Sequence, residues 1–221
     1  MQPDFWHERW QRNQIGFHQP EINPHLQGFW DQLGAAPGSR VFVPLCGKSS
    51  DMLWLRDQGF EVVGVEISPL AVRDFFREND LQADVATQGK FELWEAGGIR
   101  IYCGDFFDLG PAHLDGVRTV YDRASLVALP PAMRRDYARH MVRLLAPHSR
   151  ALLVTFEYAQ EEMQGPPFSV QEPEVRALYG GSCTIELVHD ADILEQESRF
   201  RERGMSALQE KVYLLTYNQG S

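Results

Sequence analysis

The chain has 221 residues, of which 43% are hydrophobic and 24% are charged, a composition typical of one soluble globular domain. Its formal net charge of −10 argues against binding to nucleic acids or anionic membranes, because nothing would balance the repulsion from phosphate groups. Three widely spaced cysteines without a CxxC pair fit neither a disulfide framework nor a zinc site, so no metal is expected. No signal-peptide pattern or membrane-length apolar run is present, and we expect a cytoplasmic protein that binds a small molecule.

Short β-branched runs alternate with longer amphipathic runs, which is typical of a parallel sheet flanked by helices. In chain order the sequence predicts a strand at 40–44, a helix at 50–58, a strand at 62–66, a helix at 69–79, a hairpin at 91–94, strands at 99–103 and 117–122, a helix at 131–145, and strands at 151–156, 185–188 and 211–217. The last two runs lack a clear crossover helix and suit an antiparallel pair at the end of the sheet. We expect one domain over residues 1–221, with residues 1–35 as an N-terminal extension.

The segment VFVPLCGKSSDMLWL, residues 41–55, has the form of a strand, a tight loop and a helix N-terminus, where α/β proteins hold ligands. A P-loop would need a glycine where Phe42 lies, and a dinucleotide site would need three glycines where only Gly47 is present. Glu66 ends the second strand, where an acidic side chain can bind both hydroxyls of a ribose. This pattern favours a nucleoside cofactor without a pyrophosphate, and S-adenosylmethionine is the common one. A nicotinamide-dependent oxidoreductase and a non-catalytic nucleoside-binding module are the alternatives.

Two later segments add candidate site residues. Asp105, in YCGDFFDL, follows the third strand, where it could accept a hydrogen bond from an adenine amino group while Phe106 packs on the ring. The alternative is that Asp105 belongs only to a turn and Phe106 only to the core. The segment GPPFSV, residues 165–170, predicts a rigid loop over the substrate, with Phe168 as a stacking surface.

Taken together, VFVPLCGKSSDMLWL, VVGVEIS, YCGDFFDL, YDRASLVALP, GPPFSV and EKVYLLTY resemble the thiopurine S-methyltransferase family, in the family's order and over nearly the whole chain. The resemblance implies a class I S-adenosylmethionine-dependent methyltransferase fold. That fold is a Rossmann-like three-layer α/β sandwich with a seven-stranded, mostly parallel sheet whose last strand is antiparallel, preceded here by an N-terminal lid. The implied reaction is S-methylation of aromatic and heterocyclic thiols such as thiopurines, with S-adenosylhomocysteine as the product. Bacterial relatives are also linked to methylation of selenium and tellurium compounds.

The resemblance also implies roles for individual residues. It places cofactor contacts at Trp10, Leu45, Glu66 and Arg123, with Asp105 and Phe106 beside the adenine, and the loop reasoning adds Gly47. Trp10 and Phe17 would belong to the lid that folds over the cofactor, which makes Phe17 a cofactor contact as well, although Trp6 and Trp10 also have the i, i+4 spacing of one apolar helix face.

We assign substrate contacts to Phe17, Arg123 and Phe168, and the catalytic role to Arg123. The alternative for Arg123 is an ion pair with Asp122, and either His18 or His25 could assist deprotonation of the thiol. A monomer is the default expectation.

Overall fold

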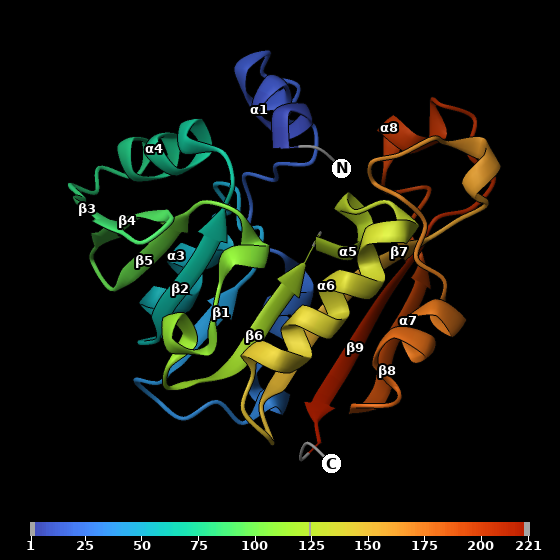
Figure 1. Cartoon of the computed structure of the whole chain (residues 1–221). Helices are drawn as coiled ribbons and strands as arrows, with labels where there is room; N and C mark the ends of the chain where they lie inside the picture. The colour runs from blue at the N-terminus through green and yellow to red at the C-terminus, as the bar shows by residue number, and fades with distance from the viewer. Residues whose placement is uncertain (1–2, 124, 219–221) are drawn as a thin grey trace. The chain divides into compact units, whose positions relative to one another are not determined.

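The computed structural model describes residues 3–123 and 125–218, and the chain divides into two compact units, Met1–Tyr121 and Asp122–Ser221. Figure 1 shows the course of the chain through both. The expectation of a single domain over residues 1–221 stays a prediction. Within the described residues, no helix combines the length and the apolar character that crossing a bilayer requires.

The first unit contains a mostly parallel sheet. Its strands are β1 (Arg40–Val43), β2 (Glu61–Glu66), β3 (Asp84–Gln88), β4 (Phe91–Ala96), β5 (Ile99–Cys103) and β6 (Val117–Arg123), the last of which crosses into the second unit. Their order is β3-β4-β5-β2-β1-β6, with β5, β2, β1 and β6 parallel to one another. The central strands are buried along almost their whole length, as expected for β-branched runs covered on both faces. The predicted strands at 40–44, 62–66, 99–103 and 117–122 are confirmed.

The helices of the first unit are α1 (Pro3–Gln11), α2 (Pro24–Phe29), α3 (Asp51–Asp57) and α4 (Pro69–Glu78). Its short 3-10 turns are η1 (Trp30–Leu33), η2 (Phe106–Asp108) and η3 (Pro111–Leu114). Helix α4 begins where the Ser68 hydroxyl accepts a hydrogen bond from the Ala71 amide at 3.3 Å, with proline at the first helical position.

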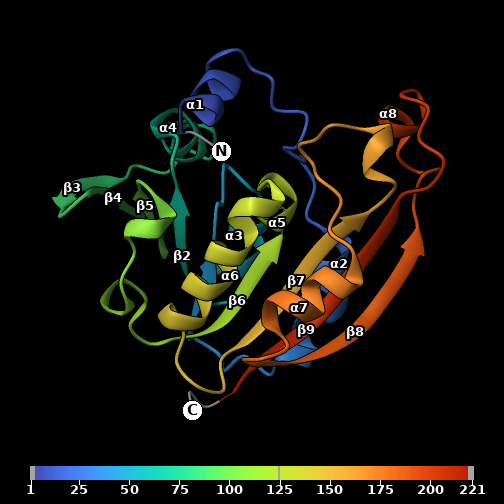
Figure 2. The same cartoon turned by 45° about the vertical axis from the view of Figure 1, so that its right-hand side comes forward.

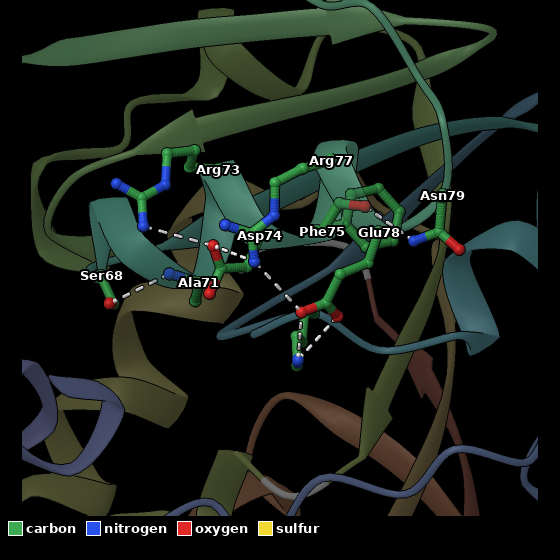
Figure 3. A network of polar contacts seen from close by, with 9 residues as sticks. Ser68, Ala71, Arg73, Asp74, Phe75, Arg77, Glu78 and Asn79 are labelled. Carbon is green, nitrogen blue, oxygen red and sulfur yellow. Dashed lines mark hydrogen bonds and ion pairs between the residues drawn. The ribbon is translucent and has the colours of Figure 1, made fainter. Parts of the chain in front are cut away.

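One face of α4 is buried, and its other face carries a chain of ion pairs. The buried face presents Ala71, Val72, Phe75 and Phe76 to the core. The opposite face carries Arg73, Asp74, Arg77 and Glu78, which pair with one another at 3.0–3.6 Å (Figure 3). This division is the amphipathic pattern that predicted the helix at 69–79.

The described residues of the second unit form three antiparallel strands and four α-helices. The strands are β7 (Arg150–Glu157), β8 (Cys183–Asp192) and β9 (Gln209–Tyr217), in the order β7-β9-β8. The helices are α5 (Ser125–Ala128), α6 (Pro131–Leu144), α7 (Glu172–Tyr179) and α8 (Ser198–Arg201), and η4 (Gln160–Glu162) is a short turn. Figure 2 shows the three strands next to one another with α7 beside β8. The expected antiparallel last strand is confirmed, because β9 runs antiparallel to both neighbours.

The expected count of seven strands is wrong, because the described residues contain nine. The hairpin predicted at 91–94 is present as β4, which pairs antiparallel with β5. Strand β3 extends the hairpin to the edge of the sheet and was missed. All five of its residues are exposed, so the strand buries neither face and its sequence lacks the alternation of apolar and polar residues by which a half-buried strand is recognised.

Candidate functional site

The loop after β1 adopts an unusual backbone conformation. Leu45 and Gly47 both have positive φ, at 47° and 52°, and only glycine adopts this region without steric cost. Between them, the buried Cys46 donates its amide to the Val65 carbonyl at 3.0 Å. Burial raises the pKa of the Cys46 thiol well above its ordinary value, so this cysteine is a packing residue and not a nucleophile.

Glu66 fastens this loop to the end of β2. Only 6% of the residue is exposed, and its Oε2 accepts a hydrogen bond from the Gly47 amide at 2.9 Å while its Oε1 accepts one from the Ser68 amide at 2.8 Å. Burial raises the pKa of the carboxyl, and the amides of Ser68, Gly47 and Ile67 oppose that shift. The side chain therefore joins the first loop to the N-terminus of α4.

The N-terminal extension covers the same loop. Trp10 is only 6% exposed, and a Cβ added to Gly47 would lie 3.3 Å from Cζ2 of its indole. Phe17 packs edge-on against both Trp10 and Trp6, with ring centroids 5.5 and 5.7 Å apart. On the same helix, Nε2 of His7 lies 3.0 Å from the Ile67 carbonyl oxygen, and His7 contributes slightly to opposing the burial-driven rise in the pKa of the neighbouring Glu66. The structure thus brings Trp10 and Phe17 together with Gly47.

Lys48 does not present its charge to a ligand on this loop. Its ammonium group donates to both carboxylate oxygens of Glu78, at 2.9 and 2.7 Å, and only 12% of its side chain is exposed. These hydrogen bonds lower the pKa of Glu78, which lies at the C-terminal end of the α4 network (Figure 3). A phosphate-binding loop uses its lysine and its backbone amides on the phosphate. Here Glu78 holds the lysine and Glu66 holds the Gly47 amide, which excludes the P-loop interpretation.

Asp105 and Phe106 follow the next strand of the same sheet. The amide of Gly104 donates to the Glu66 carbonyl oxygen at 2.9 Å, so the ends of β5 and β2 lie side by side. A Cβ on Gly104 would come within 2.6 Å of the Phe91 ring, which explains the glycine. Asp105 is half-buried and caps η2 by accepting from the Phe107 amide at 2.9 Å, and Phe106 is buried. Both residues have a structural role there, and their contact with adenine stays a prediction.

Arg123 and Phe168 belong to the second unit. Arg123 ends β6 and is half-buried. Its neighbour Asp122 accepts a hydrogen bond from the Tyr137 hydroxyl at 2.7 Å, and burial raises the pKa of Asp122 to about 6. Phe168 is half-buried and donates its amide to the Val127 carbonyl oxygen at 2.6 Å.

Sequence reasoning missed three residues that organise these segments. His7 docks the extension on Ile67, and Asp51 accepts from the Asn23 amide at 2.8 Å and the Tyr121 hydroxyl at 2.9 Å. Arg134, in α6, is fully buried. The sequence signals for these three residues were weak, because a histidine or a charged residue on an amphipathic helix usually lies at the surface.

The fold belongs to a known class of enzyme. The structure of 1,6-didemethyltoxoflavin-N1-methyltransferase from Burkholderia thailandensis, with bound S-adenosylhomocysteine, matches with a TM-score of 0.65 at 15% identity and covers 98% of this chain and 87% of that chain. The chain thus has the fold of class I S-adenosylmethionine-dependent methyltransferases.

Sequence comparison identifies the family within this class. The family model described as thiopurine S-methyltransferase matches residues 1–218. A thiopurine S-methyltransferase of Nitrosospira multiformis is 54% identical over 215 residues, which are 97% of this chain and 98% of that one. One of Pseudomonas fluorescens is 49% identical over 213 residues, or 96% and 98% of the two chains. The chain belongs to the thiopurine S-methyltransferase family. It is an S-adenosylmethionine-dependent methyltransferase, and the comparisons favour methyl transfer over the hydride transfer of the oxidoreductase alternative.

Proposed function

We propose that this protein S-methylates aromatic and heterocyclic thiols such as thiopurines, and that the loop after β1, the end of β2 and the N-terminal extension bind the cofactor. The observation that carries the proposal is the buried Glu66 carboxylate, which holds the Gly47 amide at 2.9 Å. This contact takes up an amide that a pyrophosphate would need. It also places a negative charge beside the loop, which suits a cationic nucleoside and repels a phosphate.

The donors and acceptors of the first unit fit S-adenosylmethionine. When bound, this cofactor supplies a methyl group on a positively charged sulfur. Each carboxylate oxygen has about two lone-pair sites, and Oε2 of Glu66 accepts from the Gly47 amide while Oε1 accepts from the Ser68 amide, with the Ile67 amide also stabilising the carboxylate. We assign the second lone pair of each oxygen to a ribose hydroxyl. Leu45 and Gly47 would offer main-chain groups to the cofactor, and Trp10 would close the site against water.

The remaining cofactor contacts follow from the next strand. Asp105 would accept from the adenine amino group with the lone pairs that the Phe107 amide leaves available. Phe106 would supply the apolar surface for the ring. The hydrogen bond from the Gly104 amide to the Glu66 carbonyl oxygen supports this assignment, because it places Asp105 next to the end of β2.

Arg123, Phe168 and Phe17 would bind the thiol. The nucleophile in an S-methylation is a thiolate, and heteroaromatic thiols ionise more readily than aliphatic thiols, whose pKa is about 8.5. A strong general base is therefore unnecessary, and the permanently charged guanidinium of Arg123 would hold the thiolate or a ring nitrogen of the substrate. The same group could instead bind the carboxylate of the cofactor. Phe168 and Phe17 would stack on the heterocycle. We further propose that the protein works in the cytoplasm as a monomer and binds no nucleic acid, in keeping with its net charge of −10.

Steady-state kinetics of Arg123 variants test the substrate side of the proposal. Arg123→Ala should lower kcat/KM for a thiopurine on the order of 100-fold, and Arg123→Lys should lower it less because it keeps the charge but loses the planar fork. Arg118→Ala is the matched control, since Arg118 is an exposed arginine on the same strand. Full activity of Arg123→Ala would show that Arg123 is structural.

A further inference from the structure

Arg134 is an arginine in the first turn of α6 with no exposure to solvent. Its Nε donates to the carbonyl oxygens of Leu126 at 3.1 Å and Leu129 at 2.9 Å, and its Nη1 donates to the Glu174 carboxylate at 2.6 Å. Nη2 is also buried and has no hydrogen-bond partner in the part of the chain that the structure describes. The guanidinium therefore joins α5, the segment that follows it and α7 at one point.

The same guanidinium lies beside Phe168. Its central carbon is 6.0 Å from the centroid of the Phe168 ring, at the outer limit of a cation–π contact. The ring also packs so closely on Gly165 that a Cβ there would come within 2.5 Å of Cδ1. The main chain of the loop is held as well, because the Phe168 amide donates to the Val127 carbonyl in α5 at 2.6 Å. The Tyr158 hydroxyl likewise donates to the Pro167 carbonyl at 2.6 Å.

Stability alone is a poor explanation for this arginine. A buried charge with an unsatisfied N–H group is costly, and an apolar side chain of similar volume at such a position is often neutral or stabilising. An apolar residue could not provide a planar guanidinium group that hydrogen-bonds two carbonyl oxygens and a carboxylate while facing an aromatic ring. Two of these partners adjoin residues that we propose to bind the thiol. Leu126 lies in α5, which begins two residues after Arg123, and the aromatic ring belongs to Phe168.

We infer that Arg134 is a positioning residue for substrate recognition, which fixes the orientation of the Phe168 ring. The inference rests on the proposed role of Phe168 as a surface for the heterocyclic thiol. Arg134 touches neither substrate nor cofactor in this account and acts through the loop that it holds. Its loss should therefore weaken the binding of the thiol and leave the binding of the cofactor unchanged.

The test compares Arg134→Met with Arg135→Met. The two arginines are adjacent on α6, but Arg135 is exposed, so the second variant controls for the change of residue type and charge. Arg134→Met should raise KM for a thiopurine about tenfold, while the Kd of S-adenosylhomocysteine measured by calorimetry stays at the wild-type value. Arg134→Lys should recover only part of the loss, because an ammonium cannot bond all three acceptors in one plane. Arg135→Met should behave as wild type.

Three further variants make each outcome decisive. If Arg134→Met does not fold, Glu174→Gln loosens the same guanidinium by removing its charged partner and should raise KM for the thiol in the same way. Phe168→Leu and the double variant Arg134→Met/Phe168→Leu should have the same KM, because Arg134 has nothing left to position once the ring is gone. An unchanged KM in Phe168→Leu would remove the proposed substrate contact, and the inference with it. A raised KM in Phe168→Leu but wild-type KM in Arg134→Met and Glu174→Gln would overturn the inference alone.

Discussion

Replacing Glu66 by alanine removes one carboxylate that serves both the fold and the proposed cofactor site. Its hydrogen bonds to the Gly47 and Ser68 amides are buried and involve a charged acceptor, so each contributes about 1.5–3 kcal/mol. Part of this is offset, because burial raises the pKa of Glu66 and the variant no longer buries that charge. We expect the free energy of unfolding without ligand to fall by about 2–4 kcal/mol.

The loss of cofactor affinity comes in addition to the loss of stability. Two ribose hydroxyls without their acceptor should cost about 2–4 kcal/mol, or on the order of 30- to 700-fold in the Kd of S-adenosylhomocysteine. Urea unfolding with and without this ligand separates the two effects, because the stabilisation by ligand should almost vanish in the variant. Glu61→Ala is the control, since Glu61 is an exposed glutamate on the same strand. A folded Glu66→Ala protein with wild-type affinity would refute the assignment of Glu66 to the ribose.

Three further changes test separate parts of the structure. Lys48→Met should leave the Kd of S-adenosylhomocysteine unchanged in calorimetry, because Lys48 is paired with Glu78, whereas a phosphate-binding lysine would be essential. Trp10→Ala should raise the Kd of S-adenosylhomocysteine about tenfold. This ligand should also suppress proteolysis of the wild type before residue 35, and equal cleavage with and without the ligand would argue against a lid. For Asp122, burial raises the pKa from 3.8 to about 6, so the folded state holds the proton more tightly and the resulting stabilisation is lost as the pH rises through 6. Urea unfolding should show wild-type stability falling relative to Asp122→Asn by about 2 kcal/mol between pH 4 and pH 7, and parallel curves would contradict this.

Much of the fold was predictable from the sequence because local rules and burial agree there. Helix α4 begins at Ser68 with a proline at the first helical position, and its apolar residues share one buried face. The buried strands β1 and β2 have the β-branched runs of a parallel sheet. Strand β3 could not be predicted in this way, because it is held by backbone pairing with β4 and buries no side chain. Backbone hydrogen bonds leave no pattern of apolar and polar residues in the sequence.

The candidate site was predictable in its position and less so in its contacts. The spacing of Gly47 and Glu66 indicated a loop and an acid at neighbouring strand ends, and the structure joins them by a hydrogen bond. The pairing of Lys48 with Glu78 links residues 30 positions apart and has no local signal. Arg134 also escaped prediction, because arginine is almost never fully buried and an amphipathic helix normally places it in water.

Transfer of an isotopically labelled methyl group from S-adenosylmethionine to a thiopurine, followed by mass spectrometry of the product, tests the proposed function most directly. The oxygen analogue of the same purine serves as the matched control substrate, because its hydroxyl is a far weaker acid and nucleophile than a thiol. We expect the label on the sulfur of the thiopurine, none on the oxygen analogue, and stoichiometric S-adenosylhomocysteine. Label on a ring nitrogen, or no transfer by a folded protein that binds S-adenosylhomocysteine, would contradict the proposed S-methylation.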